Sequence, residues 1–110
     1  MANVTIQLLE PIEGPSSVKD QPTTRITQIT MRAPKFPDIM LLGEPAAFAR
    51  SEGGMIYQAE KDGVIQEYIV RLLIEPKDPQ LLNQLGLADS LKLKEIVFDF
   101  FKAAREAISL

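Results

Sequence analysis

The C-terminal segment of the chain, residues 88–110, has the pattern of a long amphipathic helix. Apolar side chains recur at spacings of three and four residues, which places them on one helical face. This face consists of Leu93, Val97, Phe100, Phe101, Ala104 and Ile108. Asp89 or Ser90 is expected to accept the free N–H groups at the helix start. Because burial of each apolar side chain contributes about 1.5–3 kcal/mol, we expect this helix to form the largest part of the core.

The N-terminal part of the chain predicts a β-hairpin. Residues 4–8 alternate between apolar and polar, and Pro11 either ends this strand or places it at a sheet edge. A second strand is expected at 25–32, with a bulge or a change of face near Gln28. The polar segment 13–24 between the strands is interpreted as a loop. Such a hairpin is stable only when it lies against helices.

Several helical segments are expected between the hairpin and the final helix. They are a short helix beginning at 36–38, one or two turns at 46–51 closed by Gly53-Gly54, an apolar helix at 64–75, and a short helix at 79–85. The apolar helix begins either near Met55 or only at Asp62. The helix at 79–85 has Asp78 as its N-cap and Gly86 as a left-handed C-terminal cap. The sequence therefore predicts an α+β fold, in which a two-stranded antiparallel hairpin packs on about four helices, the last of them the longest.

The composition limits the classes of protein to consider. A chain of 110 residues with 45% apolar and 25% charged residues indicates one soluble globular domain spanning residues 1–110. The net charge of −3 and the absence of a basic patch argue against nucleic acid as a partner. The chain lacks cysteine, a signal-peptide pattern and an apolar run long enough for a membrane span, so we expect a cytoplasmic protein without membrane contact.

Catalysis finds little support in the sequence. The chain has no histidine and no cysteine, which are the usual general base and thiol nucleophile. The carboxylates of Asp89, Glu95, Glu67 and Glu75 are interpreted as solvated helix surface, and residues 61–63 as a turn rather than a calcium loop. We therefore expect no enzyme activity, no cofactor and no metal site.

A second apolar strip on the final helix is the candidate binding site. Leu91 and Phe98 flank the main apolar face, which includes Phe101, on the side of Arg105. One reading is that these side chains pack under the strands or under the helix at 64–75. The other is that Leu91, Phe98, Phe101 and Arg105 bind a partner helix, and the same strip would allow self-association into a homo-oligomer.

The order of several short motifs resembles a known family. The motifs are Val4-Thr5-Ile6-Gln7-Leu8 with Pro11-Ile12, Ile29-Thr30-Met31-Arg32-Ala33-Pro34 followed by Asp38, and Leu87-Ala88-Asp89 leading to Val97-Phe98-Asp99-Phe100-Phe101. Over residues 4–102 the chain is similar to the tail assembly chaperones of phage Mu and other contractile-tailed phages. The segment 13–24 is longer and richer in proline than this family leads us to expect, and residues 43–45 interrupt the part after Asp38.

The resemblance implies a non-enzymatic assembly factor. Such a chaperone binds the tape measure protein, keeps it soluble, and helps to recruit tail tube subunits. It acts in the cytoplasm of the infected or lysogenic bacterium and is absent from the mature virion. The alternative is a small host-type adaptor or regulatory subunit that uses the same apolar strip on an unrelated partner helix. A hydrolase with a paired-carboxylate site is a third hypothesis, and it requires a cleft with raised carboxyl pKa values.

Overall fold

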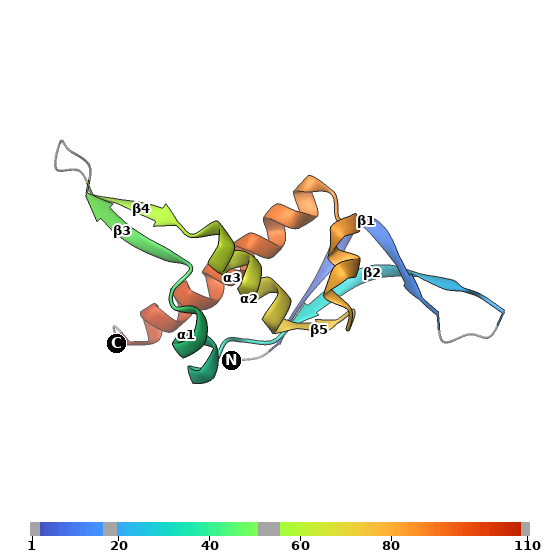
Figure 1. Cartoon of the computed structure of the whole chain (residues 1–110), viewed down its shortest axis with the longest axis horizontal. Helices are drawn as coiled ribbons and strands as arrows, with labels where there is room; N and C mark the ends of the chain where they lie inside the picture. Colours follow the sequence, from blue (N-terminus) through green and yellow to red (C-terminus); the bar gives the residue numbers. More distant parts are fainter. Residues whose placement is uncertain (1–2, 17–19, 51–55, 109–110) are drawn as a thin grey trace.

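The computed structural model describes residues 3–16, 20–50 and 56–108, and within these ranges it confirms an α+β fold. Figure 1 shows the order of the elements along the chain. They are β1 (Val4–Pro15), β2 (Thr23–Met31), α1 (Phe36–Leu42), β3 (Ala46–Arg50), β4 (Ile56–Glu60), α2 (Asp62–Leu72), β5 (Leu73–Glu75), the 3-10 helix η1 (Pro79–Gln84) and α3 (Leu87–Ile108).

The predicted hairpin is confirmed and is part of a larger sheet. β1 and β2 pair antiparallel, and β5 adds a third strand in the order β1-β2-β5. Pro11 does not end β1, because the strand lies at the edge of the sheet, where a missing N–H is tolerated. The register shifts between Gln7, which pairs with Gln28, and Ile12, which pairs with Ile26. The predicted irregularity near Gln28 is therefore confirmed, although the extra residues belong to β1.

Three predictions about loops and helices are wrong. Residues 13–15 and 23–24 continue the two strands and are not loop, because they pair with one another in the extended hairpin. The segment 46–50 is strand β3 rather than a helical turn, and it pairs with β4. Residues 73–75 form β5 beside β2 instead of the last turn of α2. In each case pairing with another strand, a neighbour in the first two cases and the distant β2 in the third, overrides the local preference of the sequence.

The start of α2 resolves one open alternative. The helix begins at Asp62 and is preceded by β4, so residues 61–63 are the beginning of a helix rather than a turn. The alternative start at Met55 and the predicted closing pair Gly53-Gly54 lie outside the described residues. Gly63 falls in the first turn of α2, where a glycine costs less than in a helix interior.

The short helix after β5 forms as η1, with the expected N-cap. The Asp78 carboxylate accepts a hydrogen bond from the N–H of Gln80 at 3.0 Å. Gly86 does not adopt the predicted left-handed conformation, and among the described residues only Gly43 has a positive φ, of 74°. Gly86 is instead a point of close approach, since a Cβ atom there would lie 2.7 Å from a carboxylate oxygen of Glu10. Gly43 supplies the C-terminal cap, but of α1.

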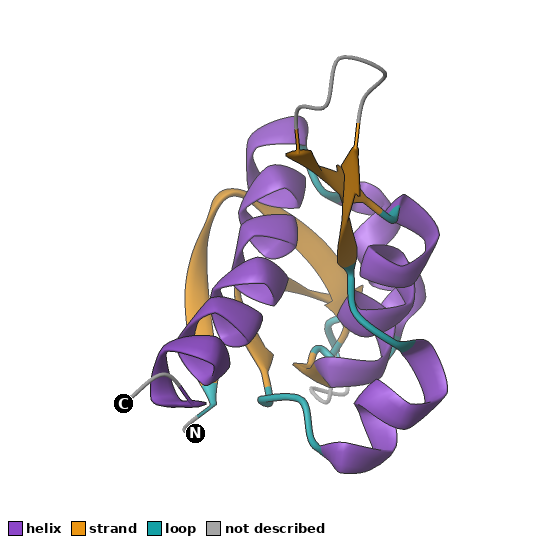
Figure 2. Cartoon of the chain, turned by 90° about the vertical axis from the view of Figure 1, so that its left-hand side faces the viewer, coloured by secondary structure: helices purple, strands orange, loops and turns teal. Residues whose placement is uncertain are grey.

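The core lies between the sheet and the long helix α3, which packs across the sheet in Figure 2. Leu93, Val97 and Phe100 of the predicted apolar face are buried in one core cluster with Ile29 and Met31 of β2. At its C-terminal end α3 extends beyond the sheet, as Figure 1 shows, so the sheet cannot bury the last apolar side chains of the predicted face. The prediction is thus wrong for Ile108, which is exposed, and Ile96 is buried instead.

Candidate interaction surface

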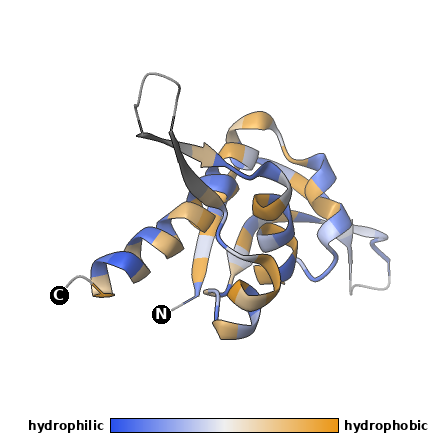
Figure 3. Cartoon of the chain, turned by 60° about the vertical axis from the view of Figure 1, so that its left-hand side comes forward, coloured by the Kyte–Doolittle hydropathy of each residue, from blue (hydrophilic) through white to orange (hydrophobic). Residues whose placement is uncertain are grey.

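The outward face of α1 is a large exposed apolar surface in the described part of the chain. Phe36, Met40 and Leu41 have exposed fractions of 72%, 64% and 66%, and Pro37 beside them is also exposed. Figure 3 shows the predominantly hydrophobic colouring of α1 at the surface of the molecule. We call these four residues the α1 face. Soluble chains seldom leave a helix face without a polar side chain, so this surface is a candidate for contact with another protein.

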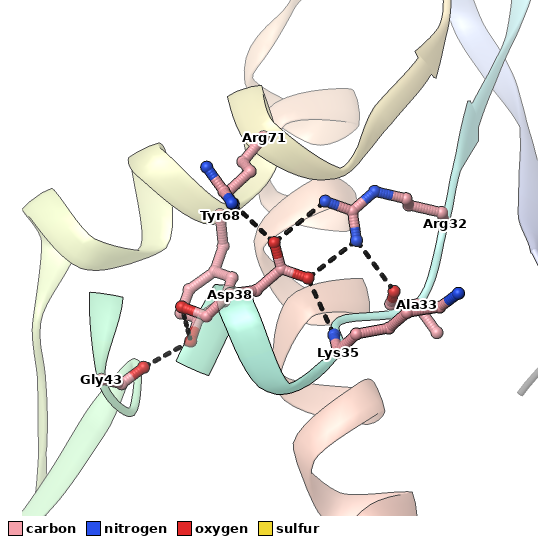
Figure 4. A network of polar contacts seen from close by, with 7 residues as sticks. All are labelled: Arg32, Ala33, Lys35, Asp38, Gly43, Tyr68 and Arg71. Atoms are coloured by element: carbon pink, nitrogen blue, oxygen red, sulfur yellow. Dashed lines mark hydrogen bonds and ion pairs between the residues drawn. The ribbon is translucent and has the colours of Figure 1, made fainter. Parts of the chain in front are cut away.

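Asp38 fixes the orientation of α1 from the opposite side of the helix. Its side chain is buried, and its carboxylate accepts two hydrogen bonds from Arg32, at 2.7 and 2.9 Å, and one from Arg71 Nε. The backbone N–H of Lys35 donates a fourth, at 2.8 Å. Figure 4 shows how these groups converge on the carboxylate from the end of β2, from α2 and from the chain before α1. Because one side chain holds α1 to β2 and α2, the apolar face is turned outward.

The ion pair between Asp38 and Arg32 shifts the pKa values of both groups. The hydrogen bond from Arg32 holds the pKa of the Asp38 carboxyl far below its usual range, and burial opposes this effect only partly. The same bond raises the pKa of Arg32. Arg32 and Arg71 bring two positive charges to the one negative charge of Asp38, and Lys35, which binds the carboxylate only through its backbone N–H, carries a third positive charge on an exposed side chain. The base of the α1 face is therefore cationic, in a chain whose net charge is −3.

Tyr68 supports the other end of α1. This buried residue of α2 donates its hydroxyl to the carbonyl oxygen of Gly43 at 2.5 Å, directly after α1. Its ring meets Phe101 of α3 edge-on, with a centroid distance of 5.3 Å and an interplanar angle of 74°. Burial raises the pKa of the Tyr68 hydroxyl. α1 is thus fixed at both ends, through Asp38 and through Tyr68.

The predicted strip on α3 is divided between core and surface. Leu91 is 55% exposed, Phe98 is half-buried, and Phe101 is half-buried against the core. Arg105 forms an ion pair with Glu44, just before β3. The structure does not gather the four residues into one open surface, and of the four it leaves Leu91 as the most exposed apolar side chain. Whether any of them binds a partner stays a prediction.

The first reading of that strip, packing beneath the helix at 64–75, applies to its central part. Lys94 lies on the same side of α3 and reaches Glu60 at the end of β4 at 2.5 Å and Asp62 at the start of α2 at 3.7 Å. Phe101 contacts Tyr68 of α2 on the same side. The beginning of α2 and the end of β4 therefore lie along this part of the strip.

Sequence reasoning did not identify the α1 face as a binding surface. A signal was present, because six of the seven residues of α1 are apolar and a seven-residue surface helix buries only one side. A short helix that is apolar around most of its circumference has more apolar surface than its own domain can bury on one side. The other side is then a candidate for contact with a second protein.

Asp89 was also misread, as solvated surface and as a helix cap with Ser90. It is buried, and its carboxylate accepts the backbone N–H groups of Leu9 and Glu10 in β1, at 2.9 and 3.0 Å. These bonds lower the pKa of the Asp89 carboxyl. The Ser90 hydroxyl donates to the carbonyl oxygen of Gly86 at 2.8 Å instead of accepting an N–H group.

Other kinds of site find no positive indication in the described ranges. Both buried carboxyl groups, Asp38 and Asp89, have lowered pKa values, whereas the hydrolase hypothesis required raised ones. No group of three or more acidic side chains comes close enough to hold a metal ion within residues 3–16, 20–50 and 56–108. Over the same residues, no helix has the length and apolar character needed to cross a membrane. Comparison of the chain with protein-family models, characterised proteins and solved structures gave no significant match.

Proposed function

We propose that this chain is a tail assembly chaperone of a contractile-tailed phage or prophage, and that it binds the tape measure protein through the α1 face. The resemblance of residues 4–102 to that family supports the class of protein. The observation that carries the mode of action is the exposed apolar surface of Phe36, Met40 and Leu41. A long helical partner with an apolar stripe buries this surface by packing along it.

The cationic base of the α1 face adds a requirement for the partner. Arg32 and Arg71 are each partly exposed, with side-chain exposures of 34% and 39%, and Lys35 is exposed beside them. A partner helix with acidic residues next to its apolar stripe gains favourable contacts there, and these weaken as salt screens them. The chaperone keeps its partner soluble because its acidic remainder faces water.

In this role the chain has no catalytic group, no cofactor and no nucleic-acid partner. It acts in the bacterial cytoplasm, helps to bring tail tube subunits to the tape measure protein, and leaves before the virion matures. Its release requires moderate affinity, so few side chains should dominate the binding energy, and Phe36 is the largest apolar candidate in the α1 face.

Co-expression with the tape measure protein of the same phage or prophage tests the proposal. We expect that protein to be soluble only in the presence of the chain, and to lose solubility with Phe36→Glu or Met40→Glu. The matched control is Ile108→Glu, which places the same charge on another exposed apolar residue. Circular dichroism should show the wild-type melting temperature for all three variants, because none of these side chains is buried.

Two outcomes contradict the proposal. If the tape measure protein is equally soluble without the chain, the chaperone role is wrong, and the adaptor hypothesis gains weight. If it remains soluble with Phe36→Glu and Met40→Glu, the role survives but the α1 face is the wrong surface. In that case the predicted strip of Leu91, Phe98, Phe101 and Arg105 is the next surface to change.

A further inference from the structure

Most of the outer edge of β1 is closed by side chains from the helices that follow. The Asp89 carboxylate binds the N–H groups of Leu9 and Glu10. The Gln84 amide accepts the N–H of Glu13 at 3.0 Å and donates to its carbonyl oxygen at 2.8 Å, as a neighbouring strand would. Natural proteins cover sheet edges in this way to prevent pairing with other chains.

Residues 4–8 form a part of this edge that no side chain caps in the described structure. The side chains of Thr5 and Gln7 face solvent, as that of Glu13 does. Arg32, directly after β2, donates its N–H to Leu72, on the side of β5. N–H direction alternates along a strand, so the N–H groups of Thr30 and Gln28 also point away from β1. Thr5 pairs with Thr30 and Gln7 pairs with Gln28. In such pairs the N–H and C=O groups of both residues point away from the partner strand, so those of Thr5 and Gln7 point to the outer edge of β1.

The helix α3 runs along this open edge in the direction opposite to β1. Asp89 lies beside Leu9, and Ile96 and Ala103 follow at seven-residue intervals on the same side of the helix. Between strand and helix is an apolar hollow. It is lined by Val4, Ile96, Asp99, Phe100 and Ala103. The open edge therefore combines unpaired backbone groups with an adjoining apolar surface.

We propose that this edge binds a second copy of the chain, with residues 4–8 of the two copies paired antiparallel about a two-fold axis at Ile6. Thr5 of each copy then lies opposite Gln7 of the other, and both residues contribute outward N–H and C=O groups. The segment carries no charge, so no like charges oppose each other across the axis. Its five residues fill the open length before the edge is closed at Leu9.

The charges on α3 complement each other about the same axis. Ile6 lies three residues before Leu9, about 10 Å along a strand, and about seven helical residues cover that distance from Asp89, which reaches Ile96. An antiparallel second α3 then places Lys92 opposite Asp99 of the other copy. Both side chains are exposed and lie on the same flank of the helix. Two symmetric ion pairs favour this arrangement over a chance contact.

Light scattering after size-exclusion chromatography at low salt tests the inference on the full chain. We expect a mass of twice 12.2 kDa for the wild type at high micromolar concentration. Lys92→Asp or Asp99→Lys alone should raise the dissociation constant about tenfold, since each turns two attractive pairs into repulsive ones. The double variant should recover the wild-type constant, because it restores the pairs in exchanged order.

A second pair of variants tests the strand contact. Thr5→Pro removes an outward N–H and should abolish the dimer. Thr5→Val loses the same hydroxyl but keeps the N–H, so this variant should still dimerise.

A third pair of variants tests the hollow. Ala103→Glu in the hollow should also dissociate the dimer, and Ala107→Glu, one turn further along α3, should not. A wild type that stays monomeric up to millimolar concentration overturns the proposal, and so does a dimer that all these variants leave intact. This assembly does not depend on the chaperone function.

Discussion

Replacing Asp38 with asparagine should remove much of the free energy that holds α1 against β2 and α2. The carboxylate accepts four hydrogen bonds, three of them from arginine side chains. An asparagine offers one oxygen and turns its NH₂ group toward donors, so about half of these bonds are lost and the rest lose their charge. Hydrogen bonds to charged groups contribute about 1.5–3 kcal/mol each, and the partial exposure of Arg32 and Arg71 reduces this value.

We therefore expect Asp38→Asn to lower the free energy of unfolding by about 2–4 kcal/mol. For a domain of this size the melting temperature should fall by about 8–16 °C. Thermal unfolding followed by circular dichroism measures the change. Asp20→Asn is the matched control, since Asp20 is exposed and its variant should melt within about 2 °C of the wild type. An Asp38→Asn variant that melts with the control would refute the reasoning.

The pH dependence gives an independent check on the same carboxylate. Its pKa is lowered in the folded state, so on acidification the unfolded chain takes up the proton first. The stability from Asp38 is complete above the unfolded value of about 4 and is lost as the pH falls below it. Asp38→Asn should flatten the decline of the melting temperature between about pH 5 and pH 2. Asp89, whose pKa is also lowered, leaves part of the decline in place.

Three further changes test other parts of the fold. Tyr68→Phe removes the hydroxyl that donates to Gly43 and should lower the free energy of unfolding by about 1 kcal/mol, seen as a lower urea midpoint at constant slope. Gly43→Ala forces a positive φ on alanine and should cost about 1–3 kcal/mol in the same assay, whereas Gly63→Ala has open space and should be neutral or stabilising. Leu91→Glu should leave the melting temperature unchanged, and a fall of about 10 °C or more with Leu91→Glu or Phe98→Glu would mark that residue as core.

The sequence predicts the elements whose signals are local. The final helix has a period of three to four residues over its whole length, and Ile29 and Met31 alternate as in a strand with one buried face. Asp78 is recognisable as an N-cap because its proline follows directly. In these places the local preference and the tertiary environment agree, so the pattern alone is sufficient.

The errors fall where pairing with another segment of the chain decides the structure. The strand at 46–50 has three alanines among its five residues, a composition that favours helix, yet it pairs with β4. Asp89 appeared to be surface because its partners, Leu9 and Glu10, are about eighty residues away in sequence and are backbone groups. A single amino-acid sequence does not show which backbone groups will lie beside a carboxylate in the folded protein. For the same reason the sequence predicted the short helix beginning at 36–38 and did not indicate which of its sides remains uncovered.

The two buried carboxylates attach the hairpin to different helices, and this separates the two candidate surfaces. Asp38 joins the end of β2 to α1 and α2, on the side of the sheet where Arg32 meets Leu72. Asp89 joins the outer edge of β1 to α3, on the other side. A dimer formed through residues 4–8 therefore leaves both α1 faces open. Two such faces on one particle would bind a long helix with repeated apolar stripes more tightly than one, because the second contact is intramolecular. In the proposed chaperone role, dissociating the dimer with Lys92→Asp should then weaken binding of the tape measure protein while the α1 face itself is unchanged.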